Sequence, residues 1–388
     1  MFGNKRYDKL NALRRLPSIP IEFFKSSILA KFRPILPTSL IYNVTWNCNA
    51  RCVMCDNWKR DSKDDLTVDE LREVFANKLF RKVRNIGLTG GEPYLRKDLP
   101  GLVRACGDNM PKLHKLTINT NGFLGDRVLP LTEEIVRYGE ERKFLIGIRV
   151  SIDGFEETHD KIRGVPGGYR KAVETLERLR ELSEKYFFNV GISYTILPEN
   201  IDETERMYQW AKDKDINLVL NVPRFTSSMM SNIHLEEEKS IRGNAAERIS
   251  DLFKRLVLEG SLFSGDIYLY HNYAKMMRNG GIRTMPCPMQ TQGLQLNPNG
   301  DIFYCEQGSI IGNVRERNPL AIYLDKENLR LRRRTVKSKC RRCQNPCMAS
   351  VSAAQQVFPY MRFFFEIFWL KMFGGRNGKQ TTPKKAGA

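Results

Sequence analysis

Short β-rich apolar runs alternate with segments of helical periodicity through the middle of the chain. The runs that predict strands cover residues 40–45, 85–89, 116–119, 145–152, 189–196 and 217–221. Between the first two runs, Thr67 with Glu70 three residues later is the pattern of a helix capping box. Residues 167–186 repeat apolar side chains at helical spacing, and 201–215 form another candidate helix. The pattern predicts successive strand–helix units.

An alternation of this kind predicts an α/β fold in which parallel strands are joined by right-handed helical crossovers. Two arrangements fit the pattern: an open sheet with helices on both faces, and a full or partial barrel. In either arrangement, functional sites lie at the carboxyl ends of the strands. The residues that directly follow each run are therefore the first candidates for a site.

The chain has 388 residues, 41% of them hydrophobic, which suffices for a large domain and a smaller one. We expect four regions. A basic and apolar helical segment covers 1–38, and the strand–helix core covers 39–235. A third region, 236–350, opens with a helix to residue 259 and continues into cysteine-rich loops. The last region, 351–388, combines an apolar helix with a flexible basic tail.

The nine cysteines fall mainly into two groups. In a reducing compartment, clustered cysteines are more often metal ligands or catalytic groups than disulfides. The N-terminal residues are basic without a following apolar core, so they do not resemble a signal peptide. No run reaches the roughly 18 apolar residues of a membrane span. These features predict a cytoplasmic protein.

The first cysteine group, Cys48, Cys52 and Cys55, directly follows the first predicted strand. A structural zinc site and a closed iron–sulfur cluster both take four protein ligands. No fourth cysteine or histidine is nearby in the sequence. Two explanations stay open on spacing alone: a zinc site completed from a distant segment, or a [4Fe–4S] cluster with one iron open to a small molecule.

Three further motifs follow the next strands in order. "LTGGEPYL" follows the second, "TINTNG" ends the third and "RVSIDG" ends the fourth. Each motif alone is no more than a tight turn at a strand end. Their order behind a cysteine triplet is specific. The candidate residues in them are Gly90, Gly91, Glu92, Asn119, Ser151 and Asp153.

With these motifs, residues 39–221 resemble the radical S-adenosylmethionine (radical SAM) superfamily. The resemblance implies a partial (βα)6 barrel in which Cys48, Cys52 and Cys55 hold a catalytic [4Fe–4S] cluster. The amino and carboxylate groups of S-adenosylmethionine would chelate the open iron. It also implies an electron donor such as flavodoxin or ferredoxin, reductive cleavage of the carbon–sulfur bond, and a 5′-deoxyadenosyl radical that takes hydrogen from a substrate.

The resemblance also assigns cofactor contacts near the triplet. Met54 stands at a position that is usually aromatic in the family, where its apolar side chain and backbone would flank the adenine. Gly90 and Gly91 would allow close backbone approach. Glu92 would accept a hydrogen bond from the ammonium group of the cofactor.

The later strands supply further candidates by the same resemblance. Ser151 and Asp153 would lie near the ribose or the carboxylate of the cofactor, and Asn119 joins this cofactor-binding set. Thr195, on the fifth strand, is a candidate for the adenosyl side. Arg163 would either pair with a carboxylate or stand as a surface residue at a helix end.

The second cysteine group resembles the SPASM extension or its shortened twitch form, which holds auxiliary iron–sulfur clusters. Its members are Cys287, Cys305, Cys340, Cys343 and Cys347. Asn299–Gly300 predicts a hairpin turn between the first two. A full SPASM domain has seven cysteines, so five imply one auxiliary [4Fe–4S] cluster and one spare thiol, either Cys340 or Cys347. An open coordination site and a zinc knuckle are the alternatives.

The net charge of the chain is +19, and part of the excess is concentrated in residues 328–343. This segment holds eight basic residues and no acidic one. Such a run is a solvated face, a phosphate-binding surface or a neighbour of an anionic cluster. No RNA-binding motif of a known type is present. A nucleic-acid partner is therefore not expected.

Residues 357–373 form an apolar segment interrupted by Arg362, Glu366 and Lys371. It is too short to span a bilayer, so it is either an interfacial helix on an anionic membrane or a helix packed on the barrel or on a second copy. The apolar and basic N-terminus favours the membrane and a hydrophobic or lipid-linked substrate. A peptide substrate is the alternative within the enzyme class. A zinc-binding basic module without catalysis is the alternative outside it.

Overall fold

A computed structural model describes residues 19–260, 265–285, 287, 289–344 and 357–373. Its first strands are β1 Ser39–Asn43, β2 Asn85–Thr89, β3 Lys115–Thr120, β4 Leu145–Ser151, β5 Asn189–Thr195 and β6 Asn217–Asn221. All six predicted strands are confirmed, and the bounds of β2 and β6 match the prediction at both ends. The predicted Cys347 and the basic tail lie outside the described residues.

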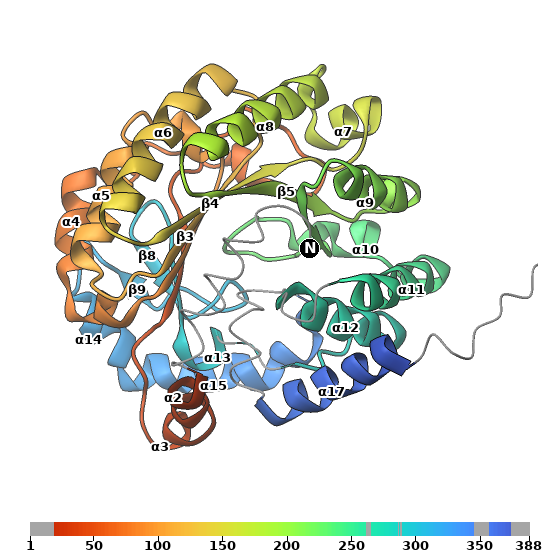
Figure 1. The fold of residues 1–388 in the computed structure, drawn as a ribbon. Helices are drawn as coiled ribbons and strands as arrows, with labels where there is room; N and C mark the ends of the chain where they lie inside the picture. Colours follow the sequence, from red (N-terminus) through yellow and green to blue (C-terminus); the bar gives the residue numbers. More distant parts are fainter. Residues whose placement is uncertain (1–18, 261–264, 286, 288, 345–356, 374–388) are drawn as a thin grey trace, which may run out of the picture.

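In the described residues, the strands form a nine-stranded sheet with the order β6-β5-β4-β3-β2-β1-β7-β8-β9. Each strand from β1 to β6 pairs in parallel with the next, and β7 (Gly293–Leu296) pairs in parallel with β1. The short strands β8 (Asp301–Phe303) and β9 (Gly312–Asn313) then add in antiparallel fashion. Figure 1 shows the sheet curving inside a ring of helices. The predicted α/β fold is confirmed, in its partial-barrel form.

Helices between the strands cover the outer face of the sheet (Figure 1). They are α4 Val68–Ala76, α5 Leu99–Asn109, α6 Gly125–Glu141, α7 Glu156–Arg163, α8 Gly168–Lys185 and α9 Thr204–Asp213. The predicted capping box begins α4, because Thr67 accepts from the Glu70 backbone and the Glu70 side chain accepts from Thr67. The backbone N–H groups of Thr67 and Glu70 are thereby satisfied, which stabilises the first turn of the helix.

Side chains alternate across each strand, so one set packs under the helices and the other faces the barrel lumen. In β3, Leu116 and Ile118 are fully buried, whereas Thr117 and Asn119 between them are half-buried. In β4, Ser151 is likewise half-buried beside the buried Val150. The apolar core therefore lies between sheet and helices, and the lumen is lined with polar groups.

The single helix predicted over 236–259 is wrong. The structure has two helices there, α10 Glu236–Lys239 and α11 Gly243–Glu259. Arg242 is extended, with φ −138° and ψ 166°, and Gly243 has a φ of +57° that a glycine adopts without strain. α12, Gly265–Arg278, then packs against α11.

The C-terminal extension places α13 Met289–Gln292 before a β7–β8 hairpin. Gly300 lies in the turn with a φ of +91°, which confirms the predicted Asn299–Gly300 hairpin. Further helices follow the hairpin: α14 Pro319–Leu324, α15 Lys326–Ser338 and α17 Val357–Phe373. α17 has the predicted bounds. Before the barrel lie α2 Ile19–Phe24, a π-turn Lys25–Leu29 and α3 Ala30–Phe32.

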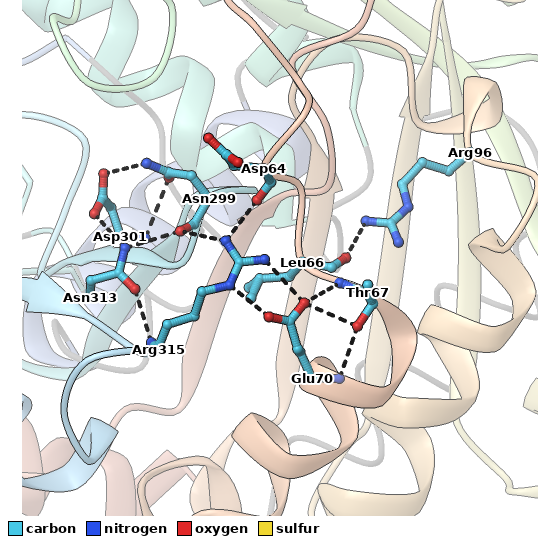
Figure 2. Close-up of polar contacts among 9 residues, drawn as sticks. All are labelled: Asp64, Leu66, Thr67, Glu70, Arg96, Asn299, Asp301, Asn313 and Arg315. Carbon is cyan, nitrogen blue, oxygen red and sulfur yellow. Dashed lines mark hydrogen bonds and ion pairs between the residues drawn. The ribbon is translucent and has the colours of Figure 1, made fainter.

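Arg315 joins this extension to the barrel (Figure 2). Its guanidinium forms an ion pair with Glu70 of α4, with Nε–Oε1 at 2.6 Å and Nη2–Oε2 at 3.1 Å. It also donates to the carbonyl oxygen of Asp64 at 2.9 Å. Hydrogen bonding to Arg315 lowers the pKa of Glu70 to about 2. This bidentate contact fixes the hairpin against the first helix of the barrel.

No helix in the described part of the chain is both long and apolar enough to traverse a bilayer.

Candidate functional site

The cysteine triplet lies on one loop after the carboxyl end of β1, and hydrogen bonds from three other parts of the barrel hold this loop. The Glu92 backbone donates to Asn47 at 2.8 Å from the β2 side. From the other side, Val53 donates to Ile162 of α7 at 2.9 Å. Asn232, after β6, donates from Nδ2 to the Met54 carbonyl at 2.6 Å. The loop is therefore positioned by contacts distant in sequence.

Two glycines after β2 allow the cysteine loop to approach. A Cβ on Gly91 would lie 2.1 Å from the Asn47 carbonyl oxygen, and a Cβ on Gly90 would lie 2.5 Å from that of Thr45. Gly90 also has a φ of +118°. The predicted close backbone approach is present, and in this structure it is made to the triplet loop. Contact of these glycines with the cofactor stays a prediction.

Glu92 is buried beneath the triplet loop, 1% exposed. Its Oε1 accepts from Thr120 Oγ1 at 2.8 Å and from the Tyr94 backbone, and its Oε2 accepts from the Asn121 backbone at 2.7 Å. Burial raises the pKa of Glu92 to about 7, although these hydrogen bonds lower it. A carboxylate has about four acceptor positions, so three donors leave room for one more. The predicted bond to an ammonium group is compatible with this count.

Asp153 and Arg163 form a buried ion pair beside the triplet. Arg163 also points its Nη1 at the sulfur of Cys52, at 3.7 Å. Although burial opposes its charge, Asp153 and Cys52 raise the pKa of Arg163 above its ordinary value. Of the two roles predicted for Arg163, surface exposure is wrong, because the residue is only 9% exposed. It pairs with a carboxylate, that of Asp153.

Several residues that hold Asp153 escaped the sequence analysis as site residues. The Asp153 backbone donates to His159 Nδ1 at 3.1 Å, and burial lowers the pKa of His159 to about 3, so this imidazole is neutral. Asn200 donates to the Asp153 and Thr195 carbonyls at 2.9 and 2.8 Å. The Thr195 backbone donates to Asp153 Oδ1 at 2.6 Å. Thr195 therefore contacts Asp153 through its backbone N–H.

The remaining predicted cofactor residues divide between loop and lumen. Met54 is 5% exposed and packs with Ile162 and Leu197. Three neighbouring strands, β3, β4 and β5, each contribute one half-buried, lumen-facing polar side chain: Asn119, Ser151 and Thr195. These positions place polar groups around the mouth of the barrel beside the triplet. Their contact with the cofactor stays a prediction.

The three thiols of the triplet suit an iron–sulfur cluster chemically. Burial raises the pKa of Cys48 to about 11 and that of Cys55 to about 12, and it raises that of Cys52. Cys52 raises the pKa of both other thiols, which places the three together. Thiols with a raised pKa become thiolates when a cationic centre binds them. The donor set therefore fits a metal cluster, whereas no three metal-ligating side chains of the described residues surround a single-ion position.

The second cysteine group gathers around one cavity. Cys287, Cys305, Cys340 and Cys343 all line it, and it is partly open to solvent. Cys287 comes just before α13, Cys305 follows β8, and the last two flank a 3-10 turn after α15. Arg283 fastens these parts, since its backbone donates to Arg341 at 2.9 Å and its Nη1 donates to Cys343 at 3.1 Å.

The pKa values of Cys287 and Cys305 reflect burial and neighbouring thiols. Burial raises the pKa of Cys305 to about 12, and Cys287 and Cys340 raise it further. The pKa of Cys287 is also raised by burial, against the effect of the Arg283 charge. Four inward thiols with a cationic neighbour fit an anionic iron–sulfur cluster. Of the predicted basic run, Arg332 lines the cavity too and is 8% exposed.

The two cysteine groups lie at opposite ends of the barrel. β1 and β7 are parallel, with Ser39 paired to Gly293. The triplet follows the carboxyl end of β1, whereas Cys287 precedes the amino end of β7. Cys305 follows the antiparallel β8 and so returns to that same amino end. Cys287 and Cys305 pack against an apolar cluster of Ile41, Met229 and Met289 in the lumen.

Comparison with known proteins agrees with this geometry. Residues 42–211 match the Radical SAM superfamily, and residues 287–344 match SPASM, described as an iron–sulfur cluster-binding domain. The fold and the two cysteine sites thus define a radical SAM enzyme. The chain is a member of the radical SAM superfamily with a C-terminal SPASM-type extension. S-adenosylmethionine and iron–sulfur clusters are the cofactors of these two domains.

A similar curated protein is the Fe-coproporphyrin III synthase of Methanosarcina barkeri, 25% identical over 358 residues, which cover 85% of this chain and 83% of that protein. The GTP 3′,8-cyclase of Tolumonas auensis is 32% identical over 184 residues, 46% of this chain and 51% of its own length. The chain thus matches about half the length of that relative and of others like it.

Solved structures share the fold. A structure of anSMEcpe with bound AdoMet has a TM-score of 0.54 at 18% identity, and the match covers 87% of this chain and 98% of that one. Streptococcus suis SuiB bound to precursor peptide SuiA has a TM-score of 0.54 at 15% identity, over 82% and 70% of the two chains. Because members of the superfamily are enzymes, the alternative of a non-catalytic zinc module is set aside.

Proposed function

We propose that this protein cleaves S-adenosylmethionine reductively at a [4Fe–4S] cluster held by Cys48, Cys52 and Cys55, and that it removes hydrogen from a substrate in the barrel lumen. The observation that supports this proposal is the placement of three half-buried, mutually close thiols on a loop at the carboxyl end of β1, which hydrogen bonds from other parts of the barrel hold in place. When bound, the cluster and S-adenosylmethionine supply a one-electron cleavage that generates a hydrogen-abstracting radical.

The surrounding residues would prepare this site. The positive charge of Arg163 near Cys52 favours the thiolate form that a ligand needs. Glu92 keeps an acceptor position for an ammonium group, and its three donors fix its orientation. Ser151, Thr195 and Asn119 supply lumen-facing polar groups for the rest of the cofactor.

For the second site, we propose Cys287, Cys305, Cys340 and Cys343 as the four ligands of an auxiliary [4Fe–4S] cluster. All four line one cavity, and Cys347, which lies outside the described residues, is the thiol that we propose as spare. Full thiolate ligation leaves no open iron. The auxiliary cluster would therefore exchange electrons at the inner end of the lumen and would not chelate substrate.

For the substrate, a hydrophobic molecule is our first candidate, and a lipid-linked one belongs to the same class. Ile41, Met229 and Met289 form a buried apolar cluster between the two sites. The M. barkeri relative that the chain matches over 83% of its length is named an Fe-coproporphyrin III synthase. A tetrapyrrole is therefore a concrete first probe. It would offer carboxylates to the polar lumen and a flat apolar ring to the methionines.

A peptide is the second candidate. SuiB, which shares the fold, is described in complex with its precursor peptide.

We further propose a cytoplasmic location and reduction by a small electron carrier such as flavodoxin or ferredoxin. Reduced thiols at both sites require a reducing compartment. Nucleic acid is not a proposed partner.

The test is anaerobic formation of 5′-deoxyadenosine and methionine from S-adenosylmethionine with a chemical reductant. We expect slow uncoupled formation by the wild type, loss of it in Cys52→Ser, and stimulation by the true substrate among coproporphyrin, haem precursors and model peptides. Wild-type protein that carries its full iron but forms no 5′-deoxyadenosine under any condition would contradict the proposal.

A further inference from the structure

Exposed apolar side chains gather on two helices at the ends of the described chain. In the described residues, eleven of the fifteen large exposed apolar side chains lie on α2–α3 and α17. We name this surface the apolar helix pair. Its exposed members are Ile21, Phe24, Ile28, Phe32, Phe358, Met361, Phe365, Phe368, Trp369, Leu370 and Met372. Soluble proteins rarely leave such a concentration uncovered, so it indicates an interaction surface.

The two parts of the pair touch each other. The rings of Phe23 and Phe358 meet edge to face, with centroids 5.9 Å apart. Figure 1 shows α2, α3 and α17 along the same side of the barrel. The exposed residues from the two helices therefore contribute to one surface, although more than 300 residues separate them in the sequence.

The inner face of α17 is already occupied. Phe363 and Ile367 are 3% and 4% exposed, and the Phe363 ring lies 4.7 Å from that of His271 on α12. Lys371 donates to the Gly260 carbonyl after α11. The helix cannot turn its outer residues inward without losing these contacts. Phe365 and Trp369, 61% and 64% exposed, remain directed away from the barrel.

Positive charge surrounds this surface. Arg33 after α3 and Arg362 on α17 are exposed, with Glu366 the exposed acid of α17. α15, which carries the exposed Arg333, Arg334 and Lys337, lies along the same side in Figure 1. A bond from Tyr323 to the Ile35 carbonyl, 2.9 Å, ties the preceding helix α14 to the segment after α3.

We infer that the apolar helix pair docks this enzyme onto an anionic lipid bilayer. An aromatic-rich face flanked by arginine and lysine is the composition of a helix that lies in the plane of a membrane interface. A helix of 17 residues is about 25 Å long, which suits lying along the surface. The last fifteen residues of the sequence add four basic residues and no acid directly after α17. The same charges would repel a second copy of the chain.

The position of the apolar helix pair relative to the barrel determines the orientation of the docked enzyme on the membrane. α3 ends at Phe32, shortly before the amino end of β1. At the α17 end of the pair, Lys371 donates to the Gly260 carbonyl. The preceding residue, Glu259, pairs at 2.9 Å with Lys212, which lies near the amino end of β6. Both contacts lie at the amino ends of strands, opposite to the cysteine triplet. Docking would anchor the enzyme with its catalytic mouth facing water.

The experiment is sedimentation of the anaerobically purified protein with vesicles, without S-adenosylmethionine. Phosphatidylcholine vesicles are compared with vesicles that also contain phosphatidylglycerol. We expect binding to the anionic vesicles and a loss of at least about a hundredfold in Phe365→Ser/Trp369→Ser, because two large side chains are withdrawn from lipid. Ile233→Ser changes an apolar residue that is also exposed, at 51%, but distant from the pair; it is the control and should bind as the wild type does.

A second variant tests the charge. Arg333→Gln/Arg334→Gln/Lys337→Gln should weaken binding to anionic vesicles about a hundredfold, at about 1 kcal/mol for each charge. Circular dichroism and iron content show that both variants fold. Absence of sedimentation with anionic vesicles would overturn the inference. Light scattering that shows a dimer, abolished by Phe365→Ser/Trp369→Ser, would overturn it too by assigning the surface to a second copy. Neither result depends on S-adenosylmethionine cleavage.

Discussion

The two cysteine sites of this enzyme are built in opposite ways. The triplet comes from eight consecutive residues, and its loop depends on bonds from β2, α7 and the segment after β6 to hold it in place. The second site collects Cys287, Cys305, Cys340 and Cys343 from three separate segments, which the hairpin and α15 bring to one cavity. The ligands of the first site are close in sequence, and residues distant in sequence hold their loop. The ligands of the second site are themselves distant in sequence.

This difference matters for what each site can tolerate. Because the three triplet cysteines are close in sequence, their mutual spacing is kept even when the barrel fluctuates. The orientation of their loop depends on neighbours such as Gly91 and Arg163. The second site loses its ligand geometry if the extension detaches from the barrel. Substitutions that act on support and on ligands should therefore affect the two sites differently.

The largest expected effect separates ligand from spare thiol at the second site. Cys305→Ala should lower the iron of the anaerobic protein by about four per chain, the content of one [4Fe–4S] cluster. Cys347→Ala, the matched control, should keep all of it. Iron and sulfide analysis measures both. Equal loss in the two variants would refute the assignment of Cys347 as spare.

A smaller effect concerns support of the triplet. Gly91→Ala should destabilise the protein by about 3 kcal/mol or more and lower the iron at the first site, because its Cβ would overlap the Asn47 carbonyl. Gly87 lies on β2, the strand that Gly91 follows; a Cβ there meets nothing within 4 Å, so Gly87→Ala serves as the control. Urea unfolding compares them. If both variants unfold at the same urea concentration as the wild type, the close approach is not needed.

Glu92 gives the triplet end a pH dependence. Its pKa is about 7 when folded, against a model value of 4.5, so the folded protein holds a proton that the unfolded chain releases between these values. Stability that Glu92 contributes in its neutral form is present below about pH 4.5 and is lost as the pH rises to about 7. At 1.36 kcal/mol per unit, this loss is roughly 3 kcal/mol.

Glu92→Gln removes this titration. The difference in unfolding free energy between cluster-free wild type and variant should therefore shift in favour of the variant from pH 5 to pH 8. Glu73→Gln, exposed on α4, should show no such shift. A wild-type-to-variant difference that is equal at both pH values would show that Glu92 titrates normally.

The smallest effect concerns the contact between extension and barrel (Figure 2). Arg315→Ala removes the bidentate pair with Glu70 and should cost about 1 kcal/mol, given that both side chains are 35% exposed. Arg317→Ala breaks only a pair with Asp325 inside the extension and should cost less. Chemical denaturation measures both. A larger loss for Arg317 would mean that Arg315 does not fasten the extension.

The strands and the triplet were predictable because their signals are local. The apolar runs of β2 and β6 and the Thr67–Glu70 capping box depend on neighbouring residues, and the structure confirms them. The break between α10 and α11 was missed although Gly243 marks it. The run of helix-forming residues on both sides outweighs one glycine in a periodicity argument.

The support of the site was harder to predict because topology decides it. Whether Arg163 is exposed or buried depends on how α7 packs against the triplet loop, 111 residues earlier in the chain. Thr120 and Asn121 lay inside a motif that was recognised, yet only the folded structure shows that they bind Glu92. His159 and Asn200 carry no local signal for their contacts with Asp153.

The central claim is that two independent clusters lie at opposite ends of one lumen. The most direct test is iron, sulfide and zinc per chain in the anaerobic wild type, in Cys48→Ala/Cys52→Ala/Cys55→Ala and in Cys287→Ala/Cys305→Ala/Cys340→Ala/Cys343→Ala. We predict about eight irons in the wild type and about four in each variant. Zinc in place of iron at either site, or loss of all iron in both variants, would contradict the account.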